Sequence, residues 1–94
     1  MPQTRADRIR AALEAAFAPA QVLVQDDSAK HAGHAGARPG GETHYSVAVV
    51  SPAFAGQSRV ARSRAVHAVL DAEFAGGLHA LALRLLTPEE AARA

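Results

Sequence analysis

The chain has 94 residues, which fits one small domain, and it carries five histidines but no cysteine. It therefore has no disulfide and no thiolate of its own for an iron–sulfur centre, and its formal net charge of +1 argues against coating nucleic acid by charge alone. Because no apolar run approaches the ~18 residues of a membrane span and no secretion signal is evident, we expect a soluble cytoplasmic protein.

The first half of the chain predicts one helix and two strands. Residues 4–17 have apolar side chains at every fourth position behind a capping Thr4, which indicates an amphipathic helix. Residues 21–26 (QVLVQD) are short and rich in β-branched side chains, and residues 42–51 (ETHYSVAVVS) alternate between the two faces of a strand. Between them, residues 27–41 hold four glycines and predict a long loop, which in a compact domain is often functional or disordered.

The second half predicts a helix, a strand and a last short helix. Ser58 can cap a helix that reaches about Phe74, and the glycine pair at 76–77 ends it. Residues 78–86 (LHALALRLL) form the third strand. The sequence TPEE at 87–90 has the threonine cap, first-turn proline and glutamate of a capping box.

This α-β-β-α-β-α order predicts an α+β fold in one small domain over residues 1–94. The first two strands should pair antiparallel, and a right-handed crossover should place the third strand parallel to the second. We expect a three-stranded mixed sheet with helices on one face. The strand residues predicted to face the core are Tyr45, Val47, Val49, Leu81, Leu83 and Leu85.

Five short segments stand in order along the chain. They are Asp27-Ser28 leading into His31, Glu42-Thr43-His44-Tyr45, Val50-Ser51 with Phe54 and Gly56, Arg62-Ser63-Arg64, and Leu78-His79-Ala80-Leu81-Ala82. In this order and spacing they resemble the BolA family over about residues 22–88. The resemblance implies a fold like the type II KH domain and a non-enzymatic protein that pairs with a monothiol glutaredoxin.

The resemblance also implies which residues would bind metal. In the BolA family the two partners hold a two-iron two-sulfur cluster, for which the glutaredoxin and its glutathione supply thiolates. The BolA-like chain supplies a histidine from its last strand and a second ligand from its hairpin loop. Carried over, His79 matches the strand ligand and His31 the loop ligand, with His34 as the alternative loop ligand. We expect the isolated chain, a monomer or weak homodimer, to bind no cluster.

Simpler interpretations of the histidines stay open. A histidine at the mouth of a strand usually packs or forms hydrogen bonds, and histidines in a glycine-rich loop are usually solvated. Strand alternation puts His79 on the core-facing side with Leu81, so it must lie beyond the covering helices to reach a metal. His44, next to Tyr45, is expected to make a cross-strand or sheet-surface contact.

Three arginines, Arg59, Arg62 and Arg64, stand near the start of the second predicted helix, where positive charge opposes the helix dipole. A bound anion would relieve this cost: a nucleic-acid phosphate, a glutathione carboxylate or an acidic patch on a partner. The family's Arg-His-Arg segment has Ser63 in its middle here. The resemblance implies, as the alternative function, a regulator of transcription in stress response and cell morphology that binds double-stranded DNA. Ordinary surface charge is the simpler interpretation.

Overall fold

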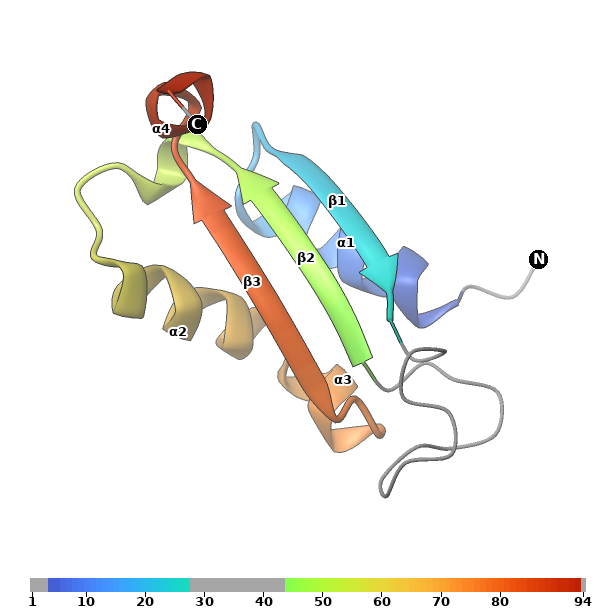
Figure 1. Ribbon diagram of the computed structural model, residues 1–94. Coiled ribbons are helices and arrows are strands. Elements are labelled where there is room, and N and C mark those ends of the chain that lie inside the picture. The colour runs from blue at the N-terminus through green and yellow to red at the C-terminus, as the bar shows by residue number, and fades with distance from the viewer. Residues whose placement is uncertain (1–3, 28–43, 94) are drawn as a thin grey trace.

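Three strands form one sheet whose rear face is covered by helices in the computed structural model, which describes residues 4–27 and 44–93 (Figure 1). The elements confirm the predicted order, with one additional break in the second helix. In chain order they are α1 (Arg5–Ala16), β1 (Gln21–Asp26), β2 (His44–Val50), the 3-10 helix η2 (Pro52–Phe54), α2 (Arg59–Val69), α3 (Asp71–Ala75), β3 (Ala80–Leu86) and α4 (Pro88–Arg93).

The sheet has the strand order β1-β2-β3, so β2 is central. β1 pairs antiparallel with β2, from Gln21 opposite Val50 to Asp26 opposite Tyr45. β3 pairs parallel with β2 along its whole length, beginning with His44 opposite Ala80. Both pairings confirm the prediction from the strand–helix–strand order.

The core lies between the sheet and helices α1 and α2. β2 alternates strictly between buried and half-buried residues, as predicted from its apolar pattern. Leu81, Leu83 and Leu85 of β3 are partly buried and pack against this core. The buried apolar side chains are Ile9, Leu13, Phe17, Tyr45, Val47, Val49, Phe54, Val66, Leu70 and Leu78. The opposite face of the sheet carries small and polar side chains of β2 and β3, together with the exposed Leu23 of β1.

Local capping fixes the ends of two helices. At α1, the Thr4 hydroxyl accepts a hydrogen bond from the Asp7 amide, and the Asp7 carboxylate accepts one from the Thr4 amide, each at 3.1 Å. The hydrogen bond from the Thr4 amide holds the pKa of Asp7 below its usual value. Thr87 and Glu90 form the same reciprocal pair at α4, with distances of 2.8 and 3.2 Å. Both capping arrangements were predicted from the sequence.

The second helix is divided at Leu70, whereas the sequence predicted one helix to about Phe74. Leu70 is 1% exposed and lies between α2 and α3, with backbone angles of φ −98° and ψ 13°. Its side chain fills the core, and the short helix α3 after it brings Glu73 against α1.

None of the helices within residues 4–27 and 44–93 combines the length and the apolar composition of a membrane-spanning helix.

Candidate functional site

His79 lies at the end of the sheet where β3 begins, opposite the end that carries α4 (Figure 1). The turn before His79 contains Gly77, whose φ is +119°. Residues other than glycine rarely adopt this backbone conformation. The next residue, Leu78, is 4% exposed in the core, and its amide donates a hydrogen bond to the Glu73 carbonyl at 2.9 Å. His79 itself is exposed, so another molecule can reach its imidazole.

A second imidazole stands beside it. The rings of His44 and His79 have centroids 5.3 Å apart, and their planes are inclined at 47°. His44 opens β2 and is opposite Ala80 in the ladder, which puts its side chain on the uncovered face of the sheet. The contact agrees with the sheet-surface contact that was the other expectation for His44. The expectation that alternation turns His79 toward the core is wrong, because β3 begins only at Ala80.

Hydrogen bonds hold the neighbouring strand end in place. The Asp27 amide donates to the His44 carbonyl at 2.7 Å. The Asp27 carboxylate accepts hydrogen bonds from the Ser46 hydroxyl and, at 2.8 Å, from the Gln25 side-chain amide. The backbone at His44 is thus fixed on both sides, by Asp27, which follows β1, and by β3. The predicted loop ligands His31 and His34 lie outside the described residues.

These donors do not make a complete metal site by themselves. Within residues 4–27 and 44–93, no group of three or more histidine, cysteine, aspartate or glutamate side chains is arranged to hold a metal ion. Two imidazoles leave a four-coordinate metal half ligated. The donor set fits a metal centre whose other ligands come from a second molecule, and neutral nitrogen donors suit iron, copper or zinc.

Arg62, a predicted anion-binding residue, is turned inward and 7% exposed. Its guanidinium donates hydrogen bonds to the carbonyls of Gln57 (3.1 Å) and Leu85 (3.0 Å). It also forms a two-pronged ion pair with Glu90 at 2.6 and 3.3 Å and lies 5.8 Å from the centre of the Phe54 ring. The hydrogen bonds from Arg62 lower the pKa of Glu90 to about 2. This geometry favours an internal role; anion binding by Arg62 stays a prediction.

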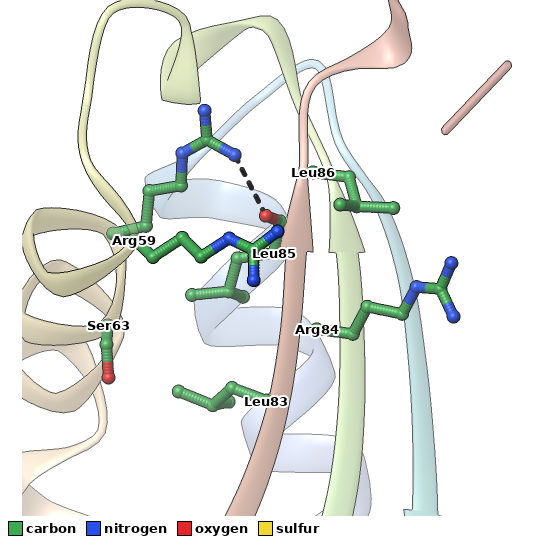
Figure 2. Close-up of a pocket in the computed structure, with 7 residues that line it drawn as sticks. Arg59, Ser63, Leu83, Arg84, Leu85 and Leu86 are labelled. Atoms are coloured by element: carbon green, nitrogen blue, oxygen red, sulfur yellow. Dashed lines mark hydrogen bonds between the residues drawn. The ribbon is translucent and has the colours of Figure 1, made fainter. Parts of the chain in front are cut away.

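The other two arginines are placed differently. Arg59 and Arg64 are exposed, and neither side chain forms a hydrogen bond or ion pair within the part of the chain that the structure describes. Arg59 lines a hollow between α2 and the outer edge of β3, and Arg84 also lines it, with its side chain on the other side of β3 from Arg59 (Figure 2). The amide of Ala61 is already capped by the Ser58 hydroxyl at 3.1 Å. Arg59 and Arg62 line the same hollow, whereas Arg64 is not part of its lining.

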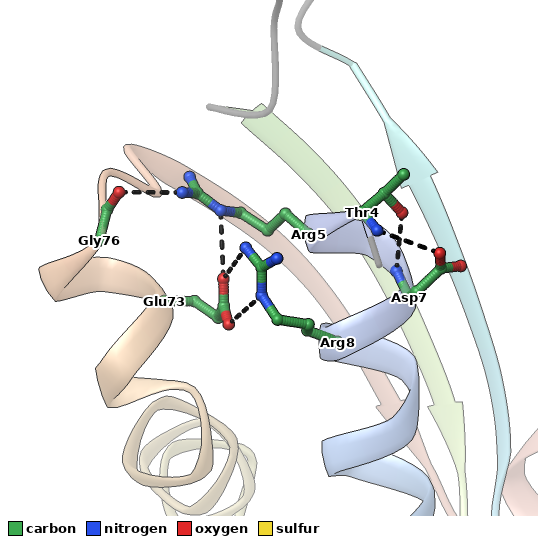
Figure 3. A network of polar contacts seen from close by, with 6 residues as sticks. All are labelled: Thr4, Arg5, Asp7, Arg8, Glu73 and Gly76. Carbon is green, nitrogen blue, oxygen red and sulfur yellow. Dashed lines mark hydrogen bonds and ion pairs between the residues drawn. The ribbon is translucent and has the colours of Figure 1, made fainter. Parts of the chain in front are cut away.

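An ion cluster that the sequence analysis missed supports the turn before His79 (Figure 3). Arg8 makes two hydrogen bonds to the Glu73 carboxylate, at 2.9 and 3.1 Å, and Arg5 lies 3.2 Å from it. Arg5 also donates to the Gly76 carbonyl at 2.9 Å. Hydrogen bonding by Arg8 lowers the pKa of Glu73. The three-residue spacing of Arg5 and Arg8 places them on the same side of α1, but it does not indicate which residue they contact.

Comparisons with known proteins agree with this architecture. A family model described as "BolA-like protein" matches residues 13–90. The chain is 41% identical over 90 residues to Protein BOLA1, chloroplastic, of Arabidopsis thaliana, which covers 94% of this chain and 56% of that protein. It is 43% identical over 90 residues to the UV-induced protein uvi31 of Schizosaccharomyces pombe, and the alignment covers 92% of this chain and 88% of that protein.

Solved structures show the same likeness. The BolA domain of SufE1 from Arabidopsis thaliana superposes with a TM-score of 0.83 at 41% identity, covering 96% of this chain and 99% of that chain. The full SufE-like protein 1 of that plant is longer, and the chain spans 24% of its length. The likeness to these longer relatives is therefore to one part of each protein.

Proposed function

Since the chain belongs to the BolA-like family, we propose that it is a non-enzymatic adaptor that pairs with a monothiol glutaredoxin. Together the two proteins hold a two-iron two-sulfur cluster for cluster assembly, trafficking or iron sensing. His79 supplies an imidazole ligand, and the glutaredoxin and its glutathione supply the thiolates. The observation that supports this most is the exposed position of His79, beside a second imidazole, in a chain without cysteine.

The donor type suits such a role. A neutral imidazole in place of a thiolate raises the reduction potential of an iron–sulfur cluster. It also binds metal only when deprotonated, which makes ligation sensitive to pH near neutrality. The chain's own contribution is to hold His79 rigidly, through buried Leu78 and the cluster around Glu73, while leaving its ring open to a partner.

The second ligand predicted from the sequence is His31, with His34 as the alternative, and both stay predictions. Both ends of their segment, at Asp27 and His44, meet at the same end of the sheet as His79. This arrangement is compatible with a ligand from either residue.

Three serine side chains in the described part of the chain have structural uses, which supports an adaptor rather than a hydrolase. Ser51 is fully buried and donates a hydrogen bond to the Phe17 carbonyl at 2.6 Å. Ser58 caps α2, and Ser46 donates to Asp27. None of these three hydroxyls is paired with a histidine as an activated nucleophile would be.

A titration with a cluster-loaded monothiol glutaredoxin tests this function. Visible absorption and circular dichroism should change when the wild-type chain is added, and the change should be lost with His79→Ala. His67→Ala is the matched control, because His67 is exposed on α2 and its ring stacks on Phe74 at 5.2 Å. An unchanged wild-type spectrum, or an equal response from His79→Ala, would contradict the assignment.

Exposed Arg59 and Arg64 favour a second candidate function, DNA-binding regulation of transcription in stress response and cell morphology. Binding to duplex DNA should then weaken with salt, and each arginine-to-alanine change should reduce the salt slope by about one phosphate contact. Arg62→Ala is unsuited to this test because its guanidinium is committed internally. If the affinity for duplex DNA changes neither with salt concentration nor with replacement of these two arginines, DNA-binding regulation is excluded.

The cytoplasmic location also stays a prediction. Two relatives, SufE-like protein 1 and Protein BOLA1 of Arabidopsis thaliana, carry names that place them in chloroplasts or mitochondria. Fractionation of cells that express the tagged chain decides between these compartments.

A further inference from the structure

The spacing of the His44 and His79 rings matches that of two imidazoles on one metal ion. A metal bound to imidazole nitrogens at about 2 Å in a tetrahedral arrangement holds the two ring centroids about 5 Å apart. The observed separation is 5.3 Å. The rings are inclined at 47° rather than stacked face to face.

The backbone on which the pair stands is fixed. His44 is held by the ladder to Ala80 on one side and by the Asp27 amide on the other. His79 is held between the buried side chain of Leu78 and the first paired residue of β3. A donor pair on such a scaffold loses little conformational freedom when it binds a metal.

The pair is also accessible. His79 is exposed and His44 half-buried, on the side of the sheet that none of the described helices covers. No third donor from the described residues joins them, so a metal bound here keeps open positions for ligands from another molecule. That is the property expected of a shared centre rather than of a closed structural zinc site.

We propose that His44 and His79 together form a two-imidazole site for a transition-metal ion whose remaining ligands come from a partner molecule. This inference rests on the proposed function for its biological meaning, and it names His44 as the second nitrogen donor beside His79. A loop histidine is then not required as the second donor.

The test uses Cu²⁺–iminodiacetate, a metal chelate with coordination positions left for imidazoles. The full chain should bind it with two nitrogen donors, measured by calorimetry and by pulsed electron paramagnetic resonance. His44→Ala and His79→Ala should each weaken binding roughly tenfold or more and leave one imidazole on the metal, because the second contact is no longer intramolecular. His67→Ala should bind like the wild type.

Two further variants keep the result decisive. His44→Gln removes the imidazole donor but preserves a polar side chain at a half-buried position. Far-ultraviolet circular dichroism then shows whether this variant is still folded. The double variant His31→Ala/His34→Ala removes both loop imidazoles. If binding is lost in that double variant but kept in His44→Ala, or if wild type shows one nitrogen donor only, the proposal is overturned.

The two proposals fail separately. One outcome is that His44→Ala leaves binding of the copper chelate unchanged while His79→Ala still abolishes the spectral response to cluster-loaded glutaredoxin. In that case the proposal of a two-histidine site is wrong and the proposed adaptor function stands. If the chelate binds through both histidines but no glutaredoxin cluster responds to the chain, the site is real and the proposed function is wrong.

Discussion

Replacing Arg62 with alanine should destabilise the fold, although the sequence suggested a surface role for this arginine. The change removes hydrogen bonds to the carbonyls of Leu85 and Gln57 and the contact with the Phe54 ring. It also removes the ion pair with Glu90, which links α2 to α4.

The size of the effect follows from these contacts. The charge-assisted hydrogen bonds and the cation–π contact together suggest a loss of about 2–3 kcal/mol in the free energy of unfolding. The side chain of Glu90 is 36% exposed, so its carboxylate stays hydrated after the change and no buried charge is stranded. With a urea slope of about 1–1.5 kcal/mol per molar, the unfolding midpoint should fall by about 2 M.

Urea unfolding followed by circular dichroism measures this shift. Arg59→Ala and Arg64→Ala are matched controls, since both arginines are exposed, and each should change stability by less than about 0.5 kcal/mol. Arg62→Lys should lie between, because an ammonium group keeps the charge but not the planar fork of donors. An Arg62→Ala midpoint equal to that of wild type would refute the internal role.

Three further changes test other parts of the fold. Ser51→Ala should lower the free energy of unfolding by about 1–3 kcal/mol, because the buried Phe17 carbonyl loses its hydrogen-bond donor; an unchanged urea midpoint contradicts this. Gly77→Ala should lower the free energy of unfolding by about 1–3 kcal/mol, because residue 77 has a φ of +119°. A midpoint of thermal unfolding equal to that of wild type would contradict this. Glu90 has its pKa lowered from 4.5 to about 2, so its stabilising effect is complete above pH 4.5 and is lost as the pH falls toward 2. Urea midpoints measured across that range should fall less steeply in Glu90→Gln, and an unaltered slope would contradict the contribution of this carboxylate.

The fold was predictable where local pattern and burial agree. The alternation of β2 gave the correct core residues because one face of the sheet is covered and the other is not. The break at Leu70 was not predictable, because Val66, Leu70 and Phe74 continue a regular helical spacing. After the break, Glu73 contacts Arg5 of α1, a residue distant in sequence, and such a contact gives no local signal.

The candidate site divides in the same way. Family resemblance pointed to His79, but its direction depended on where β3 begins, and boundaries are the weakest part of a strand prediction. Arg62 lay near the apolar stripe of its helix, a sign of burial, yet its partner Glu90 is 28 positions away. Non-local ion pairs leave no periodic trace in a sequence. The proximity of His44 to His79 depends in the same way on the parallel register.

Isotope-edited pulsed electron paramagnetic resonance would test the role of His79 most directly. The chain is labelled with ¹⁵N-histidine, mixed with an unlabelled glutaredoxin that carries its cluster, and the cluster is then reduced. We predict strong ¹⁵N hyperfine coupling to the iron, which disappears or diminishes in His79→Ala and persists in His67→Ala. A reduced cluster without ¹⁵N coupling, or with the same coupling after His79 is replaced, would contradict ligation by this residue.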